Sequence, residues 1–448
     1  MGSYEKIFKA YDVRGIVPDE LDEDVAESVG AAFVRLTGAP SVVTVHDMRT
    51  SSRPLAEAFG RGATSQGADV IEGGLGSTDV LYYASGSLGM PGAMITASHN
   101  PAKYNGIKLC REGARPVGRD TGLIELRDAA AQGLPPYHGT PGVVVQRDLL
   151  SGYASHLKKL VDLSAIRPLT VAVDAGNGMA GYTVPKVFEG LPITVVPLYF
   201  ELDGTFPNHE ANPIDPQNLR DLQRAVIDSG ADIGLAFDGD ADRCFVVDER
   251  GAVVSPSVLT ALIAVRELAR EPGAAVIHNL ITSRAVPEII TEHGGIPIRT
   301  RVGHSFIKAR MAETGAVFGG EHSGHFYFRD FWYADSGMLA ALHVLAALGE
   351  QDAPLSDVLA GYGRYVATGE INSEVADQAG ATARVRAEFA SRPGVTFDEL
   401  DGLTVTGDGW WFNLRPSNTE PLLRLNLEAS DEDTMLRLRD EVLGIVRG

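Results

Sequence analysis

Short apolar runs alternate along the chain with stretches whose apolar residues recur at helical spacing. The runs indicate buried strands and cover 42–45, 92–95, 169–173, 193–196, 233–237, 274–277 and 316–318. Helical spacing relates Leu219, Leu222 and Val226, and more loosely the residues of 257–270 and 336–348. This alternation predicts βαβ units in which helices cover largely buried sheets.

Segments rich in Pro, Gly and charge interrupt this pattern near 133–142 and 248–256, and a third boundary lies near 361–369. After the third boundary the pattern changes. Runs 410–414 and 422–427 indicate two strands around a turn, and a helical stripe follows. The stripe consists of Met435, Leu438, Val442 and Ile445. The end of the chain is therefore predicted to be a small α+β domain.

Composition narrows the classes of protein that fit. The 448 residues predict several domains, and the net charge of −20 argues against a general nucleic-acid binder. A local group of basic residues could still hold a small phosphate. The charged N-terminus and the lack of a long apolar run predict a cytoplasmic protein without a membrane partner. Cys110 and Cys244 are too few for a disulfide framework.

The loop TASHNP at 96–101 follows the apolar run 92–95 and so lies where a strand ends. Active residues of α/β sheets usually lie at such ends. Pro101 keeps Asn100 away from helical angles, and Ser98 could be a nucleophile or carry a phosphoryl group. The alternative is an ordinary loop in which Ser98 and Asn100 cap a helix or bond to the backbone.

Three acidic residues alternate in DGDADR at 238–243, directly after the run 233–237. Carboxylates at positions i, i+2 and i+4 of an extended backbone point to the same side, so Asp238, Asp240 and Asp242 could bind one Mg²⁺. A calcium loop that also uses Glu249 is disfavoured, because Arg243 replaces the glycine of its turn and the flanks are strand-like. A solvated acidic turn is the other alternative.

The segment GNGMAG at 176–181 matches the dinucleotide fingerprint, and Glu201 follows at a fitting distance. Pro197 interrupts the next strand, and Pro207 and Pro213 come soon after it. A complete dinucleotide fold is therefore not supported, and we interpret these glycines as parts of a tight strand-to-helix turn.

Polar loops also follow later strands. In GGEHSGH at 319–325, Glu321 and Ser323 could bind vicinal hydroxyls, while His322 and His325 could bind phosphate or move protons. A polar turn or a histidine metal pair is the alternative, although no Cys or third His near them completes a zinc set.

Three further segments place cations beside turn residues. The Arg fork and the hydroxyl and amide donors of RPSNTEP at 415–421 suit a dianionic phosphate, with a plain turn as the alternative. YDVRG at 11–15 and GHSFIK at 303–308 each place a cation beside glycine. Taken alone, each of these two would be structural.

In this order, the motifs resemble the α-D-phosphohexomutase family, which includes phosphomannomutases, phosphoglucomutases and phosphoglucosamine mutases. The resemblance runs nearly end to end and rests on YDVRG, TASHNP, NGIKL, DGDADR, VGHSFIK, GGEHSGH and RPSNTEP. It implies an α/β fold of three related α/β domains with mixed sheets and a smaller C-terminal α+β domain around a central cleft. We place these domains at 1–145, 146–250, 251–365 and 366–448, with the phosphoserine, metal, sugar and phosphate loops in turn.

The resemblance also implies roles for individual residues. Ser98 would be the serine that is phosphorylated, and Lys108 and His325 would be the candidates for general acid and base. The implied catalytic residues are Ser98, His99, Lys108, Arg14 and His325, and the implied Mg²⁺ ligands are Ser98, Asp238, Asp240 and Asp242. The implied substrate contacts are Tyr11, Arg243, Gly303, His304, Lys308, Glu321, Ser323, Arg415, Ser417, Asn418 and Thr419.

The activity implied is the reversible interconversion of mannose 6-phosphate and mannose 1-phosphate through phosphoserine and a hexose 1,6-bisphosphate, which also serves as activator. GEHSGH with RPSNTEP resembles the phosphomannomutase and phosphoglucomutase branch, so glucose phosphates are expected as further substrates. The partners expected are small hexose phosphates, and the chain would be a monomer or dimer. Two alternatives stay open: a phosphoglucomutase that prefers glucose phosphates, and a non-catalytic dinucleotide- or calcium-binding protein.

Overall fold

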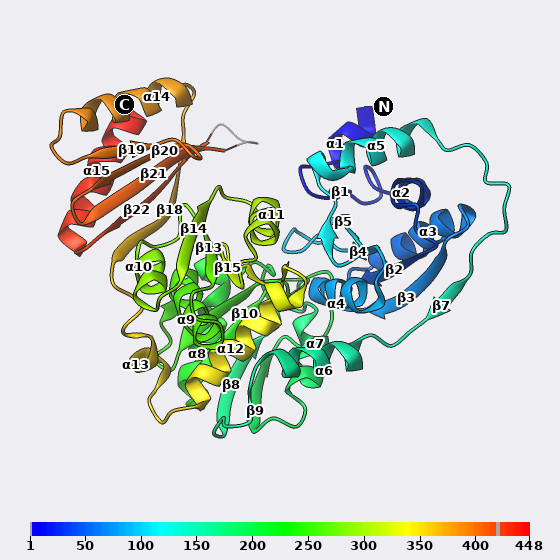
Figure 1. Cartoon of the computed structure of the whole chain (residues 1–448), viewed down its shortest axis with the longest axis horizontal. Helices are drawn as coiled ribbons and strands as arrows, with labels where there is room; N and C mark the ends of the chain where they lie inside the picture. Colours follow the sequence, from blue (N-terminus) through cyan, green and yellow to red (C-terminus); the bar gives the residue numbers. More distant parts are fainter. Residues whose placement is uncertain (1, 418–421) are drawn as a thin grey trace. The chain divides into compact units, whose positions relative to one another are not determined.

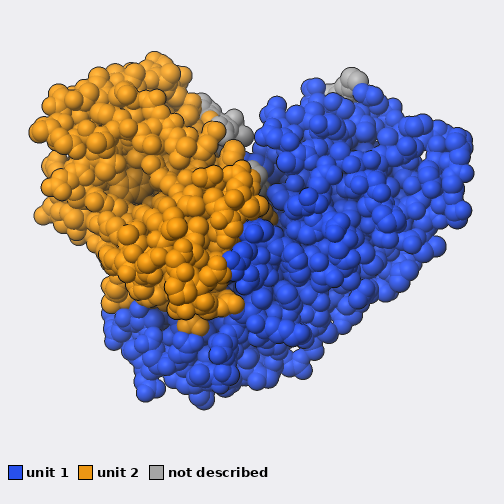
Figure 2. All heavy atoms as spheres, viewed as in Figure 1, with its two compact units in different colours: residues 1–256, 323–358 blue, residues 257–322, 359–448 orange. Residues whose placement is uncertain are grey.

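The computed structural model describes residues 2–417 and 422–448, apart from the side chains of residues 2, 3, 304 and 305. The chain forms two compact units, which are coloured separately in Figure 2. Unit 1 contains residues 1–256 and 323–358, and unit 2 contains residues 257–322 and 359–448.

The first part of unit 1 is a mixed sheet with helices (Figure 1). Its strands are β1 (Val13–Ile16), β2 (Ser41–His46), β3 (Asp69–Leu75), β4 (Gly92–Ile95), β5 (Tyr104–Arg111), β6 (Arg115–Pro116) and β7 (Val144–Gln146). Its helices are α1 (Gly2–Ile7), α2 (Glu23–Thr37), α3 (Ser52–Ser65), α4 (Thr78–Leu88) and α5 (Leu123–Gln132), with a 3₁₀ turn at Arg119–Thr121. The strand order is β1-β5-β4-β2-β3-β7, with β6 beside β5. Strand β2 runs parallel to β3 and β4, whereas β5 is antiparallel to β4 and β1.

The residues that flank helix α2 define where the helix begins and ends. Asp22 Oδ1 accepts a hydrogen bond from the backbone N–H of Val25 at 2.9 Å, which satisfies a donor of the first turn. Gly38 follows the last turn with φ of 63°, a left-handed conformation in which a side chain would be strained. These two residues therefore set the length of the helix locally.

Helices α2 and α3 pack closely because each presents a glycine to the backbone of the other. A Cβ atom on Gly30 would lie 2.1 Å from the carbonyl oxygen of Phe59, and one on Gly62 would lie 1.9 Å from that of Glu27. Both distances are far below a possible contact, so the two helices can approach this closely only with glycine at both positions.

The second sheet of unit 1 carries the acidic turn. Its strands are β8 (Leu169–Asp174), β9 (Ile193–Leu198), β10 (Ile233–Phe237), β11 (Cys244–Asp248) and β12 (Val253–Val254), and its helices are α6 (Leu150–Leu160), α7 (Ala180–Phe188) and α8 (Arg220–Ser229), with a 3₁₀ turn at Pro216–Leu219. The strand order is β12-β11-β10-β8-β9. Strand β8 is parallel to β9 and β10, and β10 and β11 form an antiparallel hairpin.

Unit 1 ends with the hairpin β16 (Phe326–Phe328) and β17 (Ala334–Asp335), a 3₁₀ turn at Arg329–Phe331 and helix α12 (Gly337–Gly349). Helix α12 is buried along its whole length, as its sequence, apolar except for His343, requires. The Ser336 side chain caps its first turn by accepting from Leu339 N at 3.0 Å. The short helix α13 (Leu355–Leu359) follows.

Unit 2 begins as an α/β layer with helices α9 (Pro256–Arg270), α10 (Ala285–Glu292) and α11 (His304–Thr314) and strands β13 (Ala275–Asn279), β14 (Ile296–Thr300) and β15 (Phe318–Gly320). Strand β13 is parallel to both β14 and β15. Its last part consists of β18 (Val366–Glu374), α14 (Gln378–Ala390), β19 (Thr396–Asp398), β20 (Leu403–Gly407), β21 (Trp410–Pro416), β22 (Leu422–Ala429) and α15 (Glu432–Arg447). This antiparallel sheet, in the order β18-β22-β21-β20-β19, shares one core with α14 and α15.

The architecture confirms the predicted fold class of mixed α/β sheets followed by an α+β segment. The predicted run 316–318 was placed too early, because β15 covers Phe318–Gly320 and continues into the glycines. Pro197 lies inside β9, which is an edge strand and can lack one backbone donor. In α15 the last buried residue of the apolar stripe is Val446, whereas the sequence predicted Ile445 at this place. No helix of the described residues is long and apolar enough to cross a membrane.

We expect Gly30→Ala to lower the free energy of unfolding by about 1–3 kcal/mol, because the new Cβ would force α2 and α3 apart. Urea unfolding would measure it. Gly444→Ala on α15 is the matched control, since a Cβ there meets no atom within 4 Å and should stabilise by up to about 1 kcal/mol. Equal behaviour of the two variants would contradict the packing argument.

Candidate active site

Two loops of unit 1 meet at a glycine. The Ser98 loop follows β4, and the turn that contains Asp238 joins β10 to β11. A Cβ on Gly239 would lie 2.4 Å from the carbonyl oxygen of Ser98, so only glycine allows this approach. Ser98 itself has φ of 49°, an uncommon conformation for a residue with a side chain. Strand ends therefore bring the TASHNP and DGDADR motifs into contact.

The Ser98 hydroxyl is buried among polar groups, with 5% of the residue exposed. Ser98 Oγ donates a hydrogen bond to Asp238 Oδ2 at 2.8 Å and accepts one from Arg243 Nη2 at 3.3 Å. His99 Nδ1 lies 3.1 Å from Ser98 Oγ and also accepts a hydrogen bond from Arg243. Burial, followed by the charges of Arg243 and Arg14, lowers the pKa of His99 to about 2, so its ring is neutral.

Asp238, Asp240 and Asp242 each offer a carboxylate oxygen within 4.8 Å of the others, and all three side chains are buried. The predicted convergence is therefore confirmed, but the predicted extended backbone is wrong. The segment is a tight turn of the β10–β11 hairpin, in which Ala241 has φ of 56°. The Oδ1 atoms of Asp240 and Asp242 are buried without a hydrogen-bond partner, which suits oxygen ligands of a hard cation.

Lys108 on β5 neutralises two of these carboxylates. Its Nζ lies 2.7 Å from Asp240 Oδ2 and 2.7 Å from Asp242 Oδ2. Burial would lower the pKa of Lys108, but the two carboxylates raise it well above its usual range. Burial would likewise raise the pKa of Asp240, yet Lys108 and Thr78 hold that pKa below its usual range. Burial would also raise the pKa of Asp242, but Lys108 and His325 hold that pKa below its usual range. Lys108, Asp240 and Asp242 therefore stay charged near neutral pH.

Asp238 differs from its neighbours because it does not contact Lys108 through a hydrogen bond. Burial raises the pKa of Asp238 to about 7, an effect that Arg243 opposes and Asp242 reinforces. Arg243 Nε donates to Asp238 Oδ2 at 3.0 Å, and Arg243 N donates to Asp238 Oδ1 at 3.2 Å. Asp238 thus links the acidic turn, Arg243 and the Ser98 hydroxyl.

Arg14 contacts the Ser98 loop through a side-chain hydrogen bond. Its Nη1 donates to Asn100 Oδ1 at 2.6 Å, and its guanidinium pairs with Asp12. Tyr11, predicted as a substrate contact, is half-buried just before it in the same N-terminal segment.

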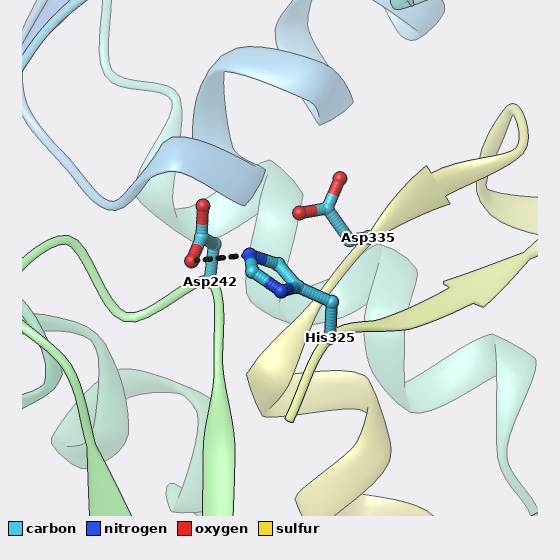
Figure 3. A group of neighbouring side chains, drawn as sticks. All are labelled: Asp242, His325 and Asp335. Carbon is cyan, nitrogen blue, oxygen red and sulfur yellow. Dashed lines mark ion pairs between the residues drawn. The ribbon is translucent and has the colours of Figure 1, made fainter. Parts of the chain in front are cut away.

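His325 and Ser323 also belong to unit 1. His325 Nε2 lies 3.6 Å from Asp242 Oδ1, and its Nδ1 lies 3.0 Å from Ser323 Oγ. Figure 3 shows the His325 ring between Asp242 and Asp335, whose ligand atoms lie within 4.8 Å of one another. His322 belongs to unit 2, where its Nδ1 lies 3.5 Å from Ser257 Oγ. The structure gives the two histidines different neighbours, which disfavours the histidine-pair alternative.

The remaining predicted substrate contacts lie in unit 2. Glu321 Oε1 accepts from Gly303 N at 3.3 Å and from Asn279 Nδ2 at 3.4 Å, and Lys308 is buried on α11. Arg415 lies at the end of β21, 3.8 Å from Glu370, with Ser417 just beyond the strand. The side chain of His304 and all of Asn418 and Thr419 lie outside the described residues.

The structure explains the two other motifs, the calcium-loop pattern that includes Glu249 and the dinucleotide fingerprint at 176–181, without a ligand. Glu249 accepts hydrogen bonds from Ser356 N and Oγ at 3.0 and 2.5 Å rather than joining the acidic turn. In the 176–181 segment, a Cβ on Gly178 would lie 2.7 Å from the Gly239 carbonyl oxygen, so this glycine serves close packing.

Sequence reasoning missed Thr78 at the start of α4. Its Oγ1 donates to Asp240 Oδ2 at 2.6 Å, and its backbone N–H donates to the Asp240 carbonyl at 3.0 Å. The segment GLGSTD carries a helix-start signature, but the contact with Asp240 spans 162 positions and has no local signal.

Asp79, next to Thr78, was missed as well. Its buried carboxylate accepts hydrogen bonds from three hydroxyls, those of Ser77, Tyr153 at 2.6 Å and Ser336 at 2.6 Å. It joins the starts of α4 and α12 to α6, and so fixes the backbone from which Thr78 reaches Asp240.

Family models match four consecutive segments of the chain. They are described as phosphoglucomutase/phosphomannomutase alpha/beta/alpha domain I at residues 5–132, domain II at 151–251, domain III at 256–365, and C-terminal domain at 370–445.

Relatives of similar length were also found. The chain is 41% identical over 444 residues to phosphohexose mutases of Xanthomonas campestris, covering 98% of this chain and 99% of that one. It is 40% identical over 445 residues to the phosphomannomutase of Escherichia coli, covering 97% of each. A crystal structure of a phosphoglucomutase/phosphomannomutase family protein from Burkholderia thailandensis has a TM-score of 0.88 at 34% identity, covering 99% of this chain and 97% of that one.

We expect Thr78→Val to weaken divalent-ion binding about 10–100-fold, because Asp240 would lose a hydrogen bond that orients it. Electron paramagnetic resonance of Mn²⁺ would measure the dissociation constant without relying on turnover. Thr78→Ser keeps the hydroxyl and is the matched control. An unchanged dissociation constant in the valine variant would remove Thr78 from the site.

Asp79 should make stability depend on pH. Burial raises the pKa of Asp79 from 3.8 to about 6, so the folded state keeps a proton that the unfolded state loses first. This contribution is complete below the unfolded value and declines by about 3 kcal/mol as pH rises through 6. Urea unfolding at intervals from about pH 4 to 7 should show the free energy of unfolding of wild type falling relative to that of Asp79→Asn as the pH rises, because asparagine does not titrate. Parallel pH profiles would contradict the raised pKa.

Proposed function

This chain belongs to the phosphoglucomutase/phosphomannomutase family, and we propose that it interconverts mannose 6-phosphate and mannose 1-phosphate as an intramolecular phosphotransferase. The observation that supports this most is the 2.8 Å hydrogen bond from Ser98 Oγ to Asp238, which joins a nucleophilic hydroxyl to the buried acidic turn. Hydrolytic side reactions are limited where such a group is buried away from water.

In the proposed reaction, Ser98 carries a phosphoryl group when the sugar monophosphate binds. A free sugar hydroxyl attacks phosphorus, the bond between phosphorus and Ser98 Oγ breaks, and a hexose 1,6-bisphosphate forms. His325 would accept the proton of the attacking hydroxyl, and Lys108 as general acid would give a proton to Ser98 Oγ as its bond to phosphorus breaks; the return transfer would reverse both steps. The bisphosphate then turns around, and its other phosphoryl group returns to Ser98. A hexose 1,6-bisphosphate can therefore also activate an unphosphorylated enzyme.

Cations around Ser98 would stabilise the transferring group. Arg243 Nη2 reaches Ser98 Oγ at 3.3 Å, where negative charge develops as the bond to phosphorus breaks. Arg14, held at the same loop through Asn100, would bind phosphate oxygens. Neutral His99 would accept the hydrogen bond of Arg243 and so aim its guanidinium.

We propose Mg²⁺ as the cofactor, with Asp238, Asp240, Asp242 and the group on Ser98 as its ligands. The chemistry of the donors supports this assignment, because all are hard oxygens and two buried carboxylate oxygens have no hydrogen-bond donor. When bound, such an ion neutralises charge on a transferring phosphoryl group.

The substrate contacts are proposed by family resemblance. Glu321 and Ser323 would bind the O3 and O4 hydroxyls, while Tyr11, Gly303, His304 and Lys308 would contact the sugar or its phosphate. Arg415, Ser417, Asn418 and Thr419 would bind the distal phosphate. The domain boundaries after residues 145, 250 and 365 stay predictions.

We expect Ser98→Ala to lower turnover by at least about 10³-fold, because no phosphoenzyme can form. Intact-mass analysis after incubation with a hexose 1,6-bisphosphate should show one phosphoryl group on wild type and none on the variant. Ser28→Ala, whose hydroxyl donates to the Asp24 carbonyl within its own helix α2, is the control. Full turnover by Ser98→Ala would refute the proposal.

Turnover rates distinguish between mannose and glucose phosphates as the preferred substrate. Rates on mannose 1-phosphate and glucose 1-phosphate, each with bisphosphate present, should favour mannose while both are used. A large preference for glucose would instead identify a phosphoglucomutase.

A further inference from the structure

A buried arginine, Arg49, directly follows β2 and is bound by its own segment. Arg49 is 3% exposed, and its neighbour Asp47 is 1% exposed. Arg49 Nε lies 3.3 Å from Asp47 Oδ2, and Arg49 N donates to Asp47 Oδ1 at 2.9 Å. Ion pairing of this kind balances the buried charge and fixes the direction of the side chain.

The guanidinium of Arg49 binds the backbone of the Ser98 loop at both ends. Its Nη2 donates to the carbonyl oxygens of Ser98 at 2.9 Å and Asn100 at 2.6 Å. Its Nη1 donates to the carbonyl oxygens of Pro101 and Tyr104, both at 3.0 Å. One planar group therefore fixes four carbonyls.

The other side of Arg49 is covered by the loop that follows β9. The guanidinium carbon lies 5.0 Å from the centre of the Phe206 ring, a cation–π distance. A Cβ on Gly204 would lie 2.6 Å from the Cα of Arg49, so this loop lies directly against the arginine. Exclusion of water strengthens each of the four hydrogen bonds.

We propose that Arg49 is a positioning residue that holds Ser98 in the orientation needed for phosphoryl transfer, an inference that rests on the proposed function. Arg49 acts on the carbonyl of Ser98 and touches no reacting atom. Ser98 has φ of 49°, a conformation that persists only where the surroundings impose it. In-line transfer depends on this orientation, because small displacements of a reacting atom slow a reaction strongly.

Lysine cannot replace this arginine. It retains the positive charge but has a single ammonium group, which cannot donate to carbonyls on two sides of a loop in one plane. Arg49→Lys therefore separates the effect of geometry from the effect of charge.

The test follows the phosphorylation of Ser98 by a hexose 1,6-bisphosphate in single-turnover experiments, with quenched samples analysed by intact mass. We expect Arg49→Lys to slow this step about 100-fold and to lower kcat in parallel. The KM for the sugar phosphate should stay within about threefold, because Arg49 contributes no contact to the sugar.

Arg167→Lys is the matched control. Arg167 also donates to two backbone carbonyls, those of Gln351 at 3.2 Å and Pro168 at 3.2 Å, and pairs with Asp232 at 3.0 Å. It should lose stability in urea without slowing the phosphorylation of Ser98. If Arg49→Lys does not fold, Phe206→Leu uncovers the guanidinium instead, and phosphorylation should slow about tenfold.

Several outcomes would overturn the inference. Phosphorylation at the wild-type rate in Arg49→Lys, or in Phe206→Leu where that variant replaces it, would show that the loop holds itself. Equal slowing by the Arg49 and Arg167 variants would show a general loss of stability. Absence of phosphoserine on wild type itself would refute the proposed function, and this inference with it.

Discussion

Burial of three carboxylates in one turn is the constraint on which unit 1 depends. Asp238, Asp240 and Asp242 are withdrawn from water, and such groups are tolerated only when cations and hydrogen-bond donors surround them. The compensating groups come from separate elements, namely Lys108 on β5, Arg243 before β11 and Thr78 at the start of α4. The acidic turn therefore requires that the first and second sheets of unit 1 pack together, and this packing places Ser98 beside Asp238.

This compensation is incomplete in a way that explains how the site can accept a cation. Lys108 and Arg243 contact three carboxylates, so one negative charge is not matched by these two partners. Burial raises the pKa of Asp238 to about 7, the charges of Asp242 and Asp240 reinforce this effect, and the Oδ1 atoms of Asp240 and Asp242 have no hydrogen-bond donor. The proposed divalent ion would supply the missing positive charge and bind the two Oδ1 atoms. The turn is thus compensated enough to fold, yet it leaves carboxylate oxygens that suit the proposed metal.

Local patterns in the sequence predicted several of the strands, the C-terminal α+β segment and the approach of the acidic residues, but they did not predict β1, β3 or β5. They also identified Ser98 correctly as a residue at a strand end, because period and turn chemistry are local properties. The backbone at 238–242 was predicted wrongly as extended, since alternation of acids is equally compatible with a tight turn in which Ala241 has a positive φ. Arg49, Thr78 and Asp79 were not predicted at all. Their partners lie far along the chain, and the 162 positions between Thr78 and Asp240 carry no periodic signal.

Two arginines act on opposite ends of Ser98, and this division follows from what each end must do. The partial charge of the Ser98 carbonyl would not change during the proposed phosphoryl transfer, so Arg49 can donate to this oxygen throughout the reaction. In the proposed reaction the Oγ atom would gain and lose negative charge, and its partner Arg243 also donates hydrogen bonds to Asp238 and His99. A single arginine could not serve both, because the donors that fix the backbone would be unavailable to the reacting oxygen. Contacts to the backbone and to the side chain of Ser98 are therefore supplied by different loops, one after β2 of the first sheet and one before β11 of the second.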